Sequence, residues 1–364
     1  MDYQQLLLAL LPDLLVVVAL FAAMGVDYSR LRGSRLAKRY EVACQISAAG
    51  LIAGLAVLVL QIAGTIPVME STADGQLVLN TGTLTLKALL YAMGLGVLPL
   101  AKRDQITPQV SEYFALLLLA TLGMGFVVTS RNLLGAFVAL ELVSLSLYAM
   151  TVLNQARRAS AEAALKYLTF GAVSSGFLLF GLSYLYGATE QLDRTQMTGL
   201  QHSPMLVLAY LLIFVGLGFK LALAPFHLWA PDVYQNAPTP VAGWIGSGSK
   251  IAAAALLIAL LQPVSDAPKL KEALIPALAA LAVLSMVVGN LGALRQTNLK
   301  RLLAYSAIAN AGYLLVGVVA FSAAGNTSVI FYILVYSLAS LGAFGVVAVL
   351  TDTLGRDAEI NDFN

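Results

Sequence analysis

Four ionisable residues lie inside, or directly beside, apolar stretches of this sequence. Glu141, Lys220 and Lys250 each occupy the middle of such a stretch, and His227 follows Lys220 by seven residues. An unpaired charge at the centre of a bilayer is unfavourable by about 2.5–3.5 kcal/mol on insertion scales. Carboxylate, ammonium and imidazole groups in a hydrated membrane interior are the groups that relay protons. The set therefore predicts a proton or ion path.

The stretch that holds Lys220 and His227 is interrupted by proline. It reads GFKLALAPFHLWAPDVYQNAPTPV over residues 218–241, and Pro225 is the first of its four prolines. Proline donates no backbone hydrogen bond and therefore breaks a helix. Within hydrocarbon, broken backbone is tolerated only where protein buries it or water lines it. We expect a discontinuous helix at this point, beside the path.

The composition is that of a polytopic helical membrane protein. Of 364 residues 59% are hydrophobic and 11% are charged, and the mean hydropathy is +0.84. The one cysteine, Cys44, excludes an internal disulfide and a cysteine-based metal cluster. We expect no metal and no cofactor on this chain, no strands, and no nucleic-acid partner. The lipid bilayer is the expected surrounding.

Apolar runs long enough to cross a bilayer recur along the whole chain. We predict eleven spans, at about 5–25, 41–66, 83–101, 112–129, 130–150, 162–186, 204–224, 240–262, 273–293, 301–321 and 328–351. The discontinuous helix is the seventh. No linker or change of composition divides the runs, so residues 1–364 are expected to form a single transmembrane domain.

The loop charges predict the orientation. The loop after the first span carries Arg30, Arg32, Arg35, Lys38 and Arg39, and alternate loops add Lys102, Arg103, Arg157, Arg158, Arg295, Lys300, Arg301 and Arg356. The other side has Arg131, Arg194, Lys269 and Lys271, and its longest loop, 67–80, contains only the acids Glu70 and Asp74. Positive loops stay inside, so the amino terminus is expected outside.

The buried charges have a structural alternative, in which Glu141 forms an ion pair with one lysine and the other lysine is unexplained. Helical spacing favours a hydrated interior instead. Ser144 and Tyr148 share the face of Glu141. Lys250 shares its face with small residues that leave room for water or for close packing: Gly243, Gly246 and Ser247. For His227, a hydrogen-bonded structural role is the alternative to a relay.

Other charged residues have simpler interpretations. Lys87 and Lys166 lie near the ends of their spans, where a long side chain can reach the interface. Asp13 is at a shallow position, and Glu141 is the one carboxylate at mid-span. Lys300 and Arg301 are expected to be topology anchors.

Several segments resemble a known family. They are VALELVSLSLYAM (138–150), ALKYLTFGAVSSGFLLFG (164–181), GLGFKLALAPFHLWAPDVYQNAPTPV (216–241), SGSKIAAA (247–254) and NLGALRQTNLKRLLAYSAIANAGYLL (290–315). The chain from about residue 110 onward is similar to the antiporter-like membrane subunits of respiratory complex I. The wording of the seventh-span motif is most similar to the branch called subunit N in bacteria and subunit 2 in mitochondria.

The resemblance implies an inverted-repeat, antiporter-like fold. Members of the family have two inverted five-helix repeats, each with a broken helix. In this sequence the amino-terminal helices occupy 1–110 and the first repeat occupies 112–262. The second repeat, 273–364, is incomplete, because its own broken helix and the charged residue expected on it are missing. We therefore expect the chain to be part of a longer one.

The resemblance also implies the function. Proton translocation would run through Glu141, Lys220 and Lys250, with Lys166 and His227 as accessory members. The chain would be a non-redox subunit of a proton-translocating NADH:quinone oxidoreductase, in a bacterial inner membrane, with other membrane-arm subunits as partners. NADH, FMN, iron–sulfur clusters and quinone would be bound by those partners.

A mechanism follows from electrostatics. A lysine in a low-dielectric site loses its proton more readily than one in water, and a nearby carboxylate opposes the loss. Weakening the Glu141–Lys220 pair would pass a proton to Lys250 through water and His227. Three other functions stay open: a subunit of a multi-subunit sodium/proton antiporter or membrane-bound hydrogenase, a secondary solute transporter, and a purely structural membrane subunit.

Overall fold

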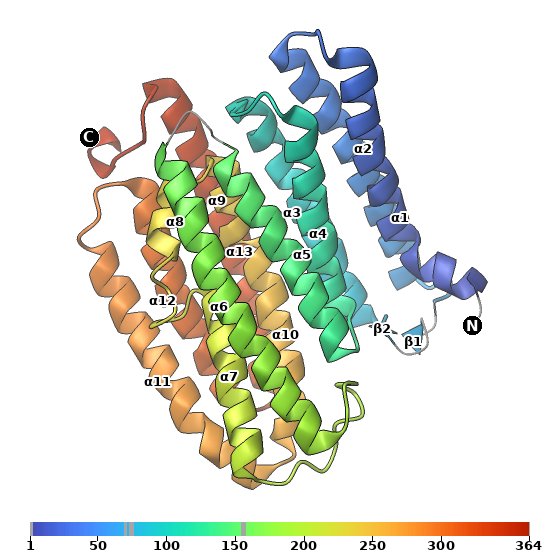
Figure 1. Cartoon of the computed structure of the whole chain (residues 1–364), viewed down its shortest axis with the longest axis vertical. Helices are drawn as coiled ribbons and strands as arrows, with labels where there is room; N and C mark the ends of the chain where they lie inside the picture. The colour runs from blue at the N-terminus through green and yellow to red at the C-terminus, as the bar shows by residue number, and fades with distance from the viewer. Residues whose placement is uncertain (1–2, 69–70, 73–75, 154–157, 364) are drawn as a thin grey trace.

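The computed structural model describes residues 3–68, 71–72, 76–153 and 158–363. It is a bundle of long helices, in which α1 and α2 form one flank and α11 and α12 the other (Figure 1). The all-α fold class is confirmed. Three residues used to predict the orientation, Glu70, Asp74 and Arg157, lie outside the described residues.

Eleven helical segments of the described residues are long and apolar enough to cross a membrane. They are built from α1 (Tyr3–Val26) with its π-helical extension η1 (Asp27–Leu31), α2 (Leu36–Ile62), α3 (Thr81–Asp104), α4 (Val110–Thr129), α5 (Leu133–Val152), α6 (Arg158–Thr189), α7 (Pro204–Leu221), α9 (Thr239–Gly246) with α10 (Gly248–Ser265), α11 (Pro268–Ala293), α12 (Leu299–Val319) and α13 (Ala323–Leu354). Two shorter helices, α8 (Ala230–Asn236) and η2 (Ile360–Phe363), complete the set.

Two details differ from the sequence-based expectation. The sequence predicts no strands, but β1 (Ser71–Thr72) and β2 (Leu77–Val78) pair antiparallel, with Ser71 opposite Val78 and Thr72 opposite Leu77. The span predicted as continuous over 240–262 is also interrupted. Ser247, with φ −120° and ψ −80°, separates α9 from α10. Lys250 therefore lies in the first turn of a new helix.

Polar residues fix where the helices begin. The first backbone N–H groups of a helix have no partner within it, and a side-chain oxygen can accept from them. Asn80 accepts from the Thr83 N–H in a reciprocal capping box at the start of α3. The same type of bond begins four other helices, from Asn132 (α5), Ser203 (α7), Asn298 (α12) and Ser322 (α13).

Small residues allow the helices that carry the charged groups to pack closely. α6 and α7 lie side by side (Figure 1) and meet at Gly181 and Gly216. A Cβ at Gly216 would stand 2.5 Å from Leu178 Cβ, and one at Gly181 would stand 2.8 Å from the Ala209 carbonyl oxygen. Close backbone approach at small residues is the usual basis of helix association in membranes. It fixes α6 against α7 next to Lys220.

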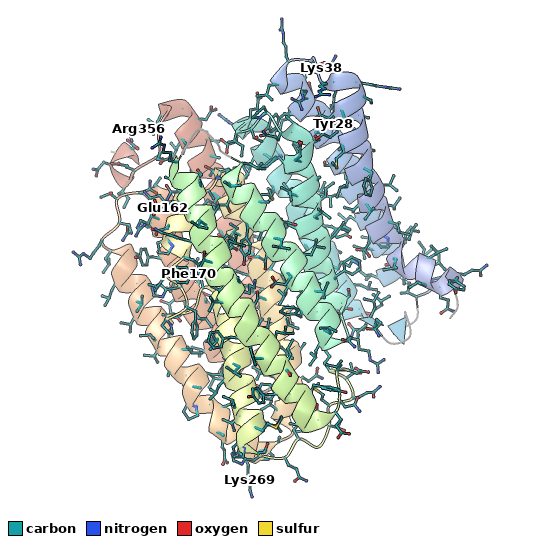
Figure 2. The ribbon with its side chains drawn as sticks, viewed as in Figure 1. Tyr28, Lys38, Glu162, Phe170, Lys269 and Arg356 are labelled. Atoms are coloured by element: carbon teal, nitrogen blue, oxygen red, sulfur yellow. The ribbon has the colours of Figure 1, made fainter. Side chains whose placement is uncertain are left out.

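The two ends of the bundle carry the charges that the orientation argument places on opposite sides. Figure 2 shows Lys38 and Arg356 at one end and Lys269 at the other. Tyr28, which lies near the end of the first span, is at the same end of the bundle as Lys38. The alternation of the loops is therefore as predicted for these residues.

The interpretation of Asp13 and Lys87 as interfacial residues is wrong. Lys87 is 1% exposed and Asp13 is 3% exposed, and Lys87 Nζ lies 2.6 Å from Asp13 Oδ2. The Tyr91 hydroxyl donates to Asp13 Oδ1 over 2.7 Å. The sequence does not reveal this contact, because the two charges belong to different spans and depth alone does not pair them.

Candidate proton-transfer site

Lys220 lies in the last turn of α7, directly before the break that the prolines predict. The helix ends at Leu221 and is capped by Ala222, which has the left-handed φ of +60°. Pro225 cannot donate to a helical ladder, so the chain runs irregularly until α8 begins at Ala230. Because the carbonyl end of a helix favours cations, this position is suited to an ammonium.

Protein groups satisfy the broken backbone. The Ala224 N–H donates to Ser285 Oγ of α11 over 2.9 Å, and the Leu223 N–H donates to the Gly218 carbonyl over 2.7 Å. The Trp229 indole N–H donates to the Phe219 carbonyl over 3.2 Å. Unpaired backbone groups are strongly unfavourable in hydrocarbon, so these bonds explain how the break persists within the bundle.

Glu141 and Lys220 are brought together as a loose ion pair. Lys220 Nζ lies 3.6 Å from Glu141 Oε1, which is too long for a direct hydrogen bond. Instead, Lys220 Nζ donates to Ser144 Oγ over 2.5 Å, and Ser175 Oγ donates to Glu141 Oε1 over 2.6 Å. The Tyr148 ring centroid lies 6.0 Å from the ammonium. Each charge thus has a hydroxyl partner of its own, and the pair can separate without leaving either group unsolvated.

Lys250 lies apart from any carboxylate of the described residues. It is 1% exposed, its Nζ donates to the Ala307 carbonyl of α12 over 2.8 Å, and the Tyr336 ring centroid of α13 lies 5.7 Å away. A neutral carbonyl and an aromatic face hold an ammonium less strongly than a carboxylate does. Among the described residues, the recorded partners of the Lys250 ammonium are therefore a neutral carbonyl and an aromatic ring.

The small residues near Lys250 serve close packing. A Cβ at Gly243 would lie 3.1 Å from Phe344 Cβ, and one at Gly246 would lie 3.2 Å from Ser340 Oγ, both on α13. The Ser337 hydroxyl of α13 also donates to the Ser247 carbonyl over 3.3 Å. Of the two alternatives for these glycines, room for water or close packing, the structure shows the second.

His227 lies half-buried in the break between α7 and α8. Its carbonyl accepts from the Ala230 N–H over 2.8 Å and begins the turn into α8. Within the described part of the chain, no direct side-chain hydrogen bond joins His227 to Lys220 or to Lys250. A transfer between the three would need water.

Lys166 belongs to a separate ion cluster. Its Nζ lies 2.8 Å from Glu162 Oε1 and 2.9 Å from Asp232 Oδ2, and its side chain is 41% exposed. Arg301 of α12 donates to the other oxygen of Asp232 over 2.7 Å. Asp232 thus joins α6, α8 and α12. The structure places Lys166 at the end of the broken helix and not beside Glu141.

The interpretation of Lys300 and Arg301 as mere topology anchors is incomplete. Lys300 is 3% exposed and donates to the Ala237 carbonyl at the end of α8 over 3.1 Å. Arg301 binds Asp232, as described above, and also donates to Gln235 Oε1 over 3.2 Å. Together they hold α8 against α12. The sequence places Asp232 between prolines but does not indicate these partners.

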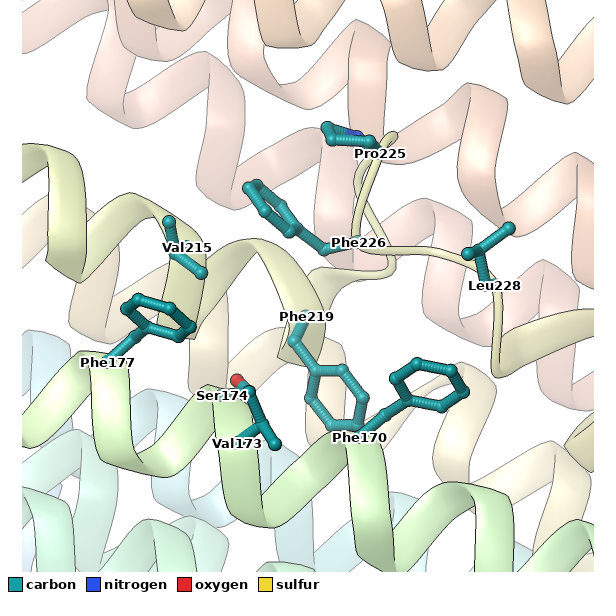
Figure 3. A pocket seen from close by; sticks show the side chains of 9 residues that line it. All are labelled: Phe170, Val173, Ser174, Phe177, Val215, Phe219, Pro225, Phe226 and Leu228. Carbon is teal, nitrogen blue, oxygen red and sulfur yellow. The ribbon is translucent and has the colours of Figure 1, made fainter.

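An apolar pocket is lined in part by Phe219, the residue before Lys220. It has a volume of about 290 Å³ and lies between α6, α7 and the break (Figure 3). Four aromatic rings shape it, those of Phe170, Phe177, Phe219 and Phe226. Its one hydroxyl, Ser174 Oγ, donates to the Gly216 carbonyl over 3.0 Å. The described lining of this pocket is therefore almost entirely apolar.

Comparison with known proteins identifies the family. The family model "NADH:quinone oxidoreductase/Mrp antiporter, TM" matches residues 130–363. NADH-quinone oxidoreductase subunit N 2 of Acidobacterium capsulatum is 44% identical over 375 residues, which cover 98% of this chain and 74% of that protein. Subunit N of Halorhodospira halophila is 45% identical over 255 residues, 69% of this chain and 52% of that protein. The chain thus spans between half and three quarters of these relatives.

Solved structures show the same fold. A chain of respiratory complex I from Thermus thermophilus with bound aureothin has a TM-score of 0.76 and 35% identity, over 93% of this chain and 70% of that one. A chain of the archaeal membrane-bound sulfane sulfur reductase has a TM-score of 0.78 and 25% identity, over 97% and 73%. A chain of the Mrp complex of Dietzia sp. DQ12-45-1b, 20% identical with a TM-score of 0.77 over 97% and 65%, shares the fold. This chain therefore belongs to the antiporter-like membrane subunits of the NADH:quinone oxidoreductase/Mrp antiporter family, with relatives named NADH-quinone oxidoreductase subunit N.

Proposed function

We propose that this chain is a proton-translocating membrane-arm subunit of a bacterial NADH:quinone oxidoreductase. The observation that carries the proposal is the loose Glu141–Lys220 pair at the end of a broken helix. Intramembrane charges that are paired but not locked together are typical of proton paths. The higher identity to subunit N than to the sulfane sulfur reductase or Mrp chains favours this assignment over a sodium/proton antiporter or hydrogenase subunit. Neither a solute transporter nor a purely structural subunit explains why Lys220 and Lys250 lie within the bundle.

In the proposed mechanism, protons move between the lysines as the ion pair opens and closes. While Glu141 is near, the Lys220 ammonium is stabilised. When the pair opens, Lys220 passes its proton through water, with His227 as an accessory relay, to Lys250. A charged Lys250 then repels further positive charge, so the sites titrate as a coupled set. Lys166, bound to Asp232, acts as an accessory member by fixing the end of the broken helix.

We further propose that the redox chemistry belongs to partner subunits, which would bind NADH, FMN, iron–sulfur clusters and quinone. This chain would be a non-redox subunit of the enzyme. Residues 112–262 would form the first repeat and 273–364 the beginning of the second, after amino-terminal helices in 1–110.

Replacing Glu141 by glutamine is expected to impair proton translocation while the complex still assembles. The neutral amide no longer holds the Lys220 ammonium, yet it fills the same space and can still accept from Ser175. The measurement is the pH gradient formed by inverted membrane vesicles during NADH oxidation. Glu272→Gln, at an exposed carboxylate, is the matched control and should pump normally. Normal pumping by Glu141→Gln would leave the pair with a structural role at most.

We propose a bacterial plasma-membrane location with the amino terminus outside, on the strength of the loop charges. The experiment uses single cysteines in a Cys44→Ser background: Ala37→Cys for the basic loop and Gln76→Cys for the acidic loop, both exposed positions. An impermeant thiol reagent applied to intact cells should label Gln76→Cys and spare Ala37→Cys until the cells are permeabilised. The opposite pattern would invert the orientation.

A further inference from the structure

Glu141 and Lys220 lie on two helices that share a neighbour. Glu141 belongs to α5 and Lys220 to α7, and both helices pack against α6. The carboxylate and the ammonium are 3.6 Å apart, which is too long for a direct hydrogen bond that would fix their distance. The packing of α5 and of the broken helix against α6 therefore determines how far apart the two charges lie.

Three buried aromatic rings connect these helices beside the ion pair. Tyr148 of α5 lies edge-on against Tyr167 of α6, with 4.5 Å between the ring centroids and 74° between the ring planes. Tyr167 in turn stacks on Trp229, directly before α8, with a centroid distance of 4.4 Å and an angle of 9°. The three side chains, which we call the aromatic stack, are buried. The aromatic stack thus runs from α5 across α6 to the break.

Each end of the aromatic stack reaches Lys220 or the residue before it. The Tyr148 ring centroid lies 6.0 Å from Lys220 Nζ, and Tyr148 is one turn after Ser144, which accepts a hydrogen bond from that ammonium. At the other end, the Trp229 indole N–H donates to the Phe219 carbonyl over 3.2 Å, and Phe219 directly precedes Lys220. A shift of the rings would therefore move both the face of α5 beside the ammonium and the backbone that carries it.

A glycine on α6 makes room for the Tyr148 ring. Gly171 follows Tyr167 by four residues, so both lie on one face of α6. A Cβ at Gly171 would stand 1.8 Å from the Tyr148 hydroxyl oxygen and 2.6 Å from the carbon that bears it, so the ring would have to move. Gly176 of the same helix differs, because a Cβ there would meet no atom of the described residues within 4 Å. The close approach at Gly171 is thus specific to the aromatic stack.

We propose that Tyr148, Tyr167 and Trp229 are positioning residues for proton transfer, whose packed rings set the separation of Glu141 and Lys220. The inference rests on the proposed function and deepens it by naming what keeps the pair close without locking it. Aromatic rings suit this role because edge-on and stacked pairs have preferred geometries. Transfer between two groups depends steeply on their distance and orientation, so small displacements of the rings should matter.

The central ring provides the first test, in liposomes that contain the assembled enzyme. Tyr167→Leu removes the ring but keeps an apolar side chain, and it should cause at least about half of the loss in protons translocated per NADH that Glu141→Gln causes. Tyr167→Phe keeps the ring and should retain the wild-type ratio. Tyr113→Leu is the matched control and should pump normally, because Tyr113 belongs to a different cluster of buried rings, with Tyr40 and Phe114.

Three outcomes of this test would overturn the proposal. They are a wild-type ratio in Tyr167→Leu, an equal loss in Tyr167→Phe, and an equal loss in Tyr113→Leu. The first would show that the ring does not act on transfer, the second that the hydroxyl matters rather than the stacking, and the third that any loss of a buried ring has the same effect. A failure of the proposed function is seen differently, as normal pumping by Glu141→Gln.

The second test displaces a ring without removing one. Gly171→Ala should move Tyr148 and lower the proton ratio as Tyr167→Leu does, whereas Gly176→Ala on the same helix should not. If Tyr167→Leu does not assemble, this pair of variants decides. Combining Gly171→Ala with Tyr167→Leu should lower the ratio no further than the more severe single variant, because both act through the same contacts. A wild-type ratio in Gly171→Ala, or additive losses in the combination, would contradict the proposal.

Discussion

Arginine in place of Lys250 is expected to stop proton translocation about as completely as alanine does. The guanidinium keeps its charge at any accessible pH, so it can occupy the site but cannot pass a proton on. The Ala307 carbonyl and the Tyr336 ring could still bind it. The measurement is the pH gradient formed by membrane vesicles during NADH oxidation, with assembly checked separately. Lys269→Arg, at an exposed lysine near the end of the bundle, is the control (Figure 2).

The alanine variant separates the two possible roles of Lys250. If the lysine only fills space or anchors a partner's carboxylate, arginine should restore what alanine loses. If it relays protons, the two variants should be alike. Full translocation by Lys250→Arg would remove Lys250 from the path.

The second large effect is expected on stability, at the buried pair of Asp13 and Lys87. Asp13→Asn alone leaves an ammonium without its counter-charge among α1, α3 and α4, which should lower the free energy of unfolding by about 3–5 kcal/mol. The double variant Asp13→Asn with Lys87→Met removes both charges, and it should recover most of that loss because a neutral replacement of a buried pair is often tolerated. The measurement is thermal or denaturant unfolding of the purified protein in detergent.

A surface ion pair is the control for this effect. Lys102 and Glu41 lie 3.2 Å apart with side chains 45% and 51% exposed, so Glu41→Gln should change the stability by less than about 1 kcal/mol. The same double variant also tests function. The Asp13–Lys87 pair is buried and bonded to its own partners, and we expect the double variant to pump protons normally. Impaired pumping in a stable double variant would assign the pair to a proton path.

The sequence predicts the parts of the site that follow from residues of a single span, such as a charge that is unfavourable in hydrocarbon. A charge in hydrocarbon needs a partner, so Glu141, as a carboxylate at mid-span, is a natural partner for Lys220, and the structure places them together. Pro225 likewise predicts the broken helix from the local sequence, because proline donates no backbone hydrogen bond. The partners that complete the site come from other helices. Ser175 on α6 and Ala307 on α12 cannot be assigned to Glu141 and Lys250 without knowing which helices are neighbours.

Some misses had a signal in the sequence. The glycines around Ser247 are consistent with an interruption between α9 and α10, because glycine disfavours a continuous helix. The pairing of Asp13 with Lys87 had no such signal, because the two residues are 74 positions apart in the chain and lie in different helices.

The central claim, that this chain carries protons from the Glu141–Lys220 pair to Lys250, is tested most directly by the number of protons translocated per NADH oxidised. The ratio should be measured in one series of liposomes containing assembled enzyme that is wild type, Glu141→Gln or Lys250→Arg. Because both substitutions interrupt one path, the account predicts that both ratios fall, and to a similar value, while NADH oxidation continues. A wild-type ratio in both variants would contradict it and place the proton path in other subunits.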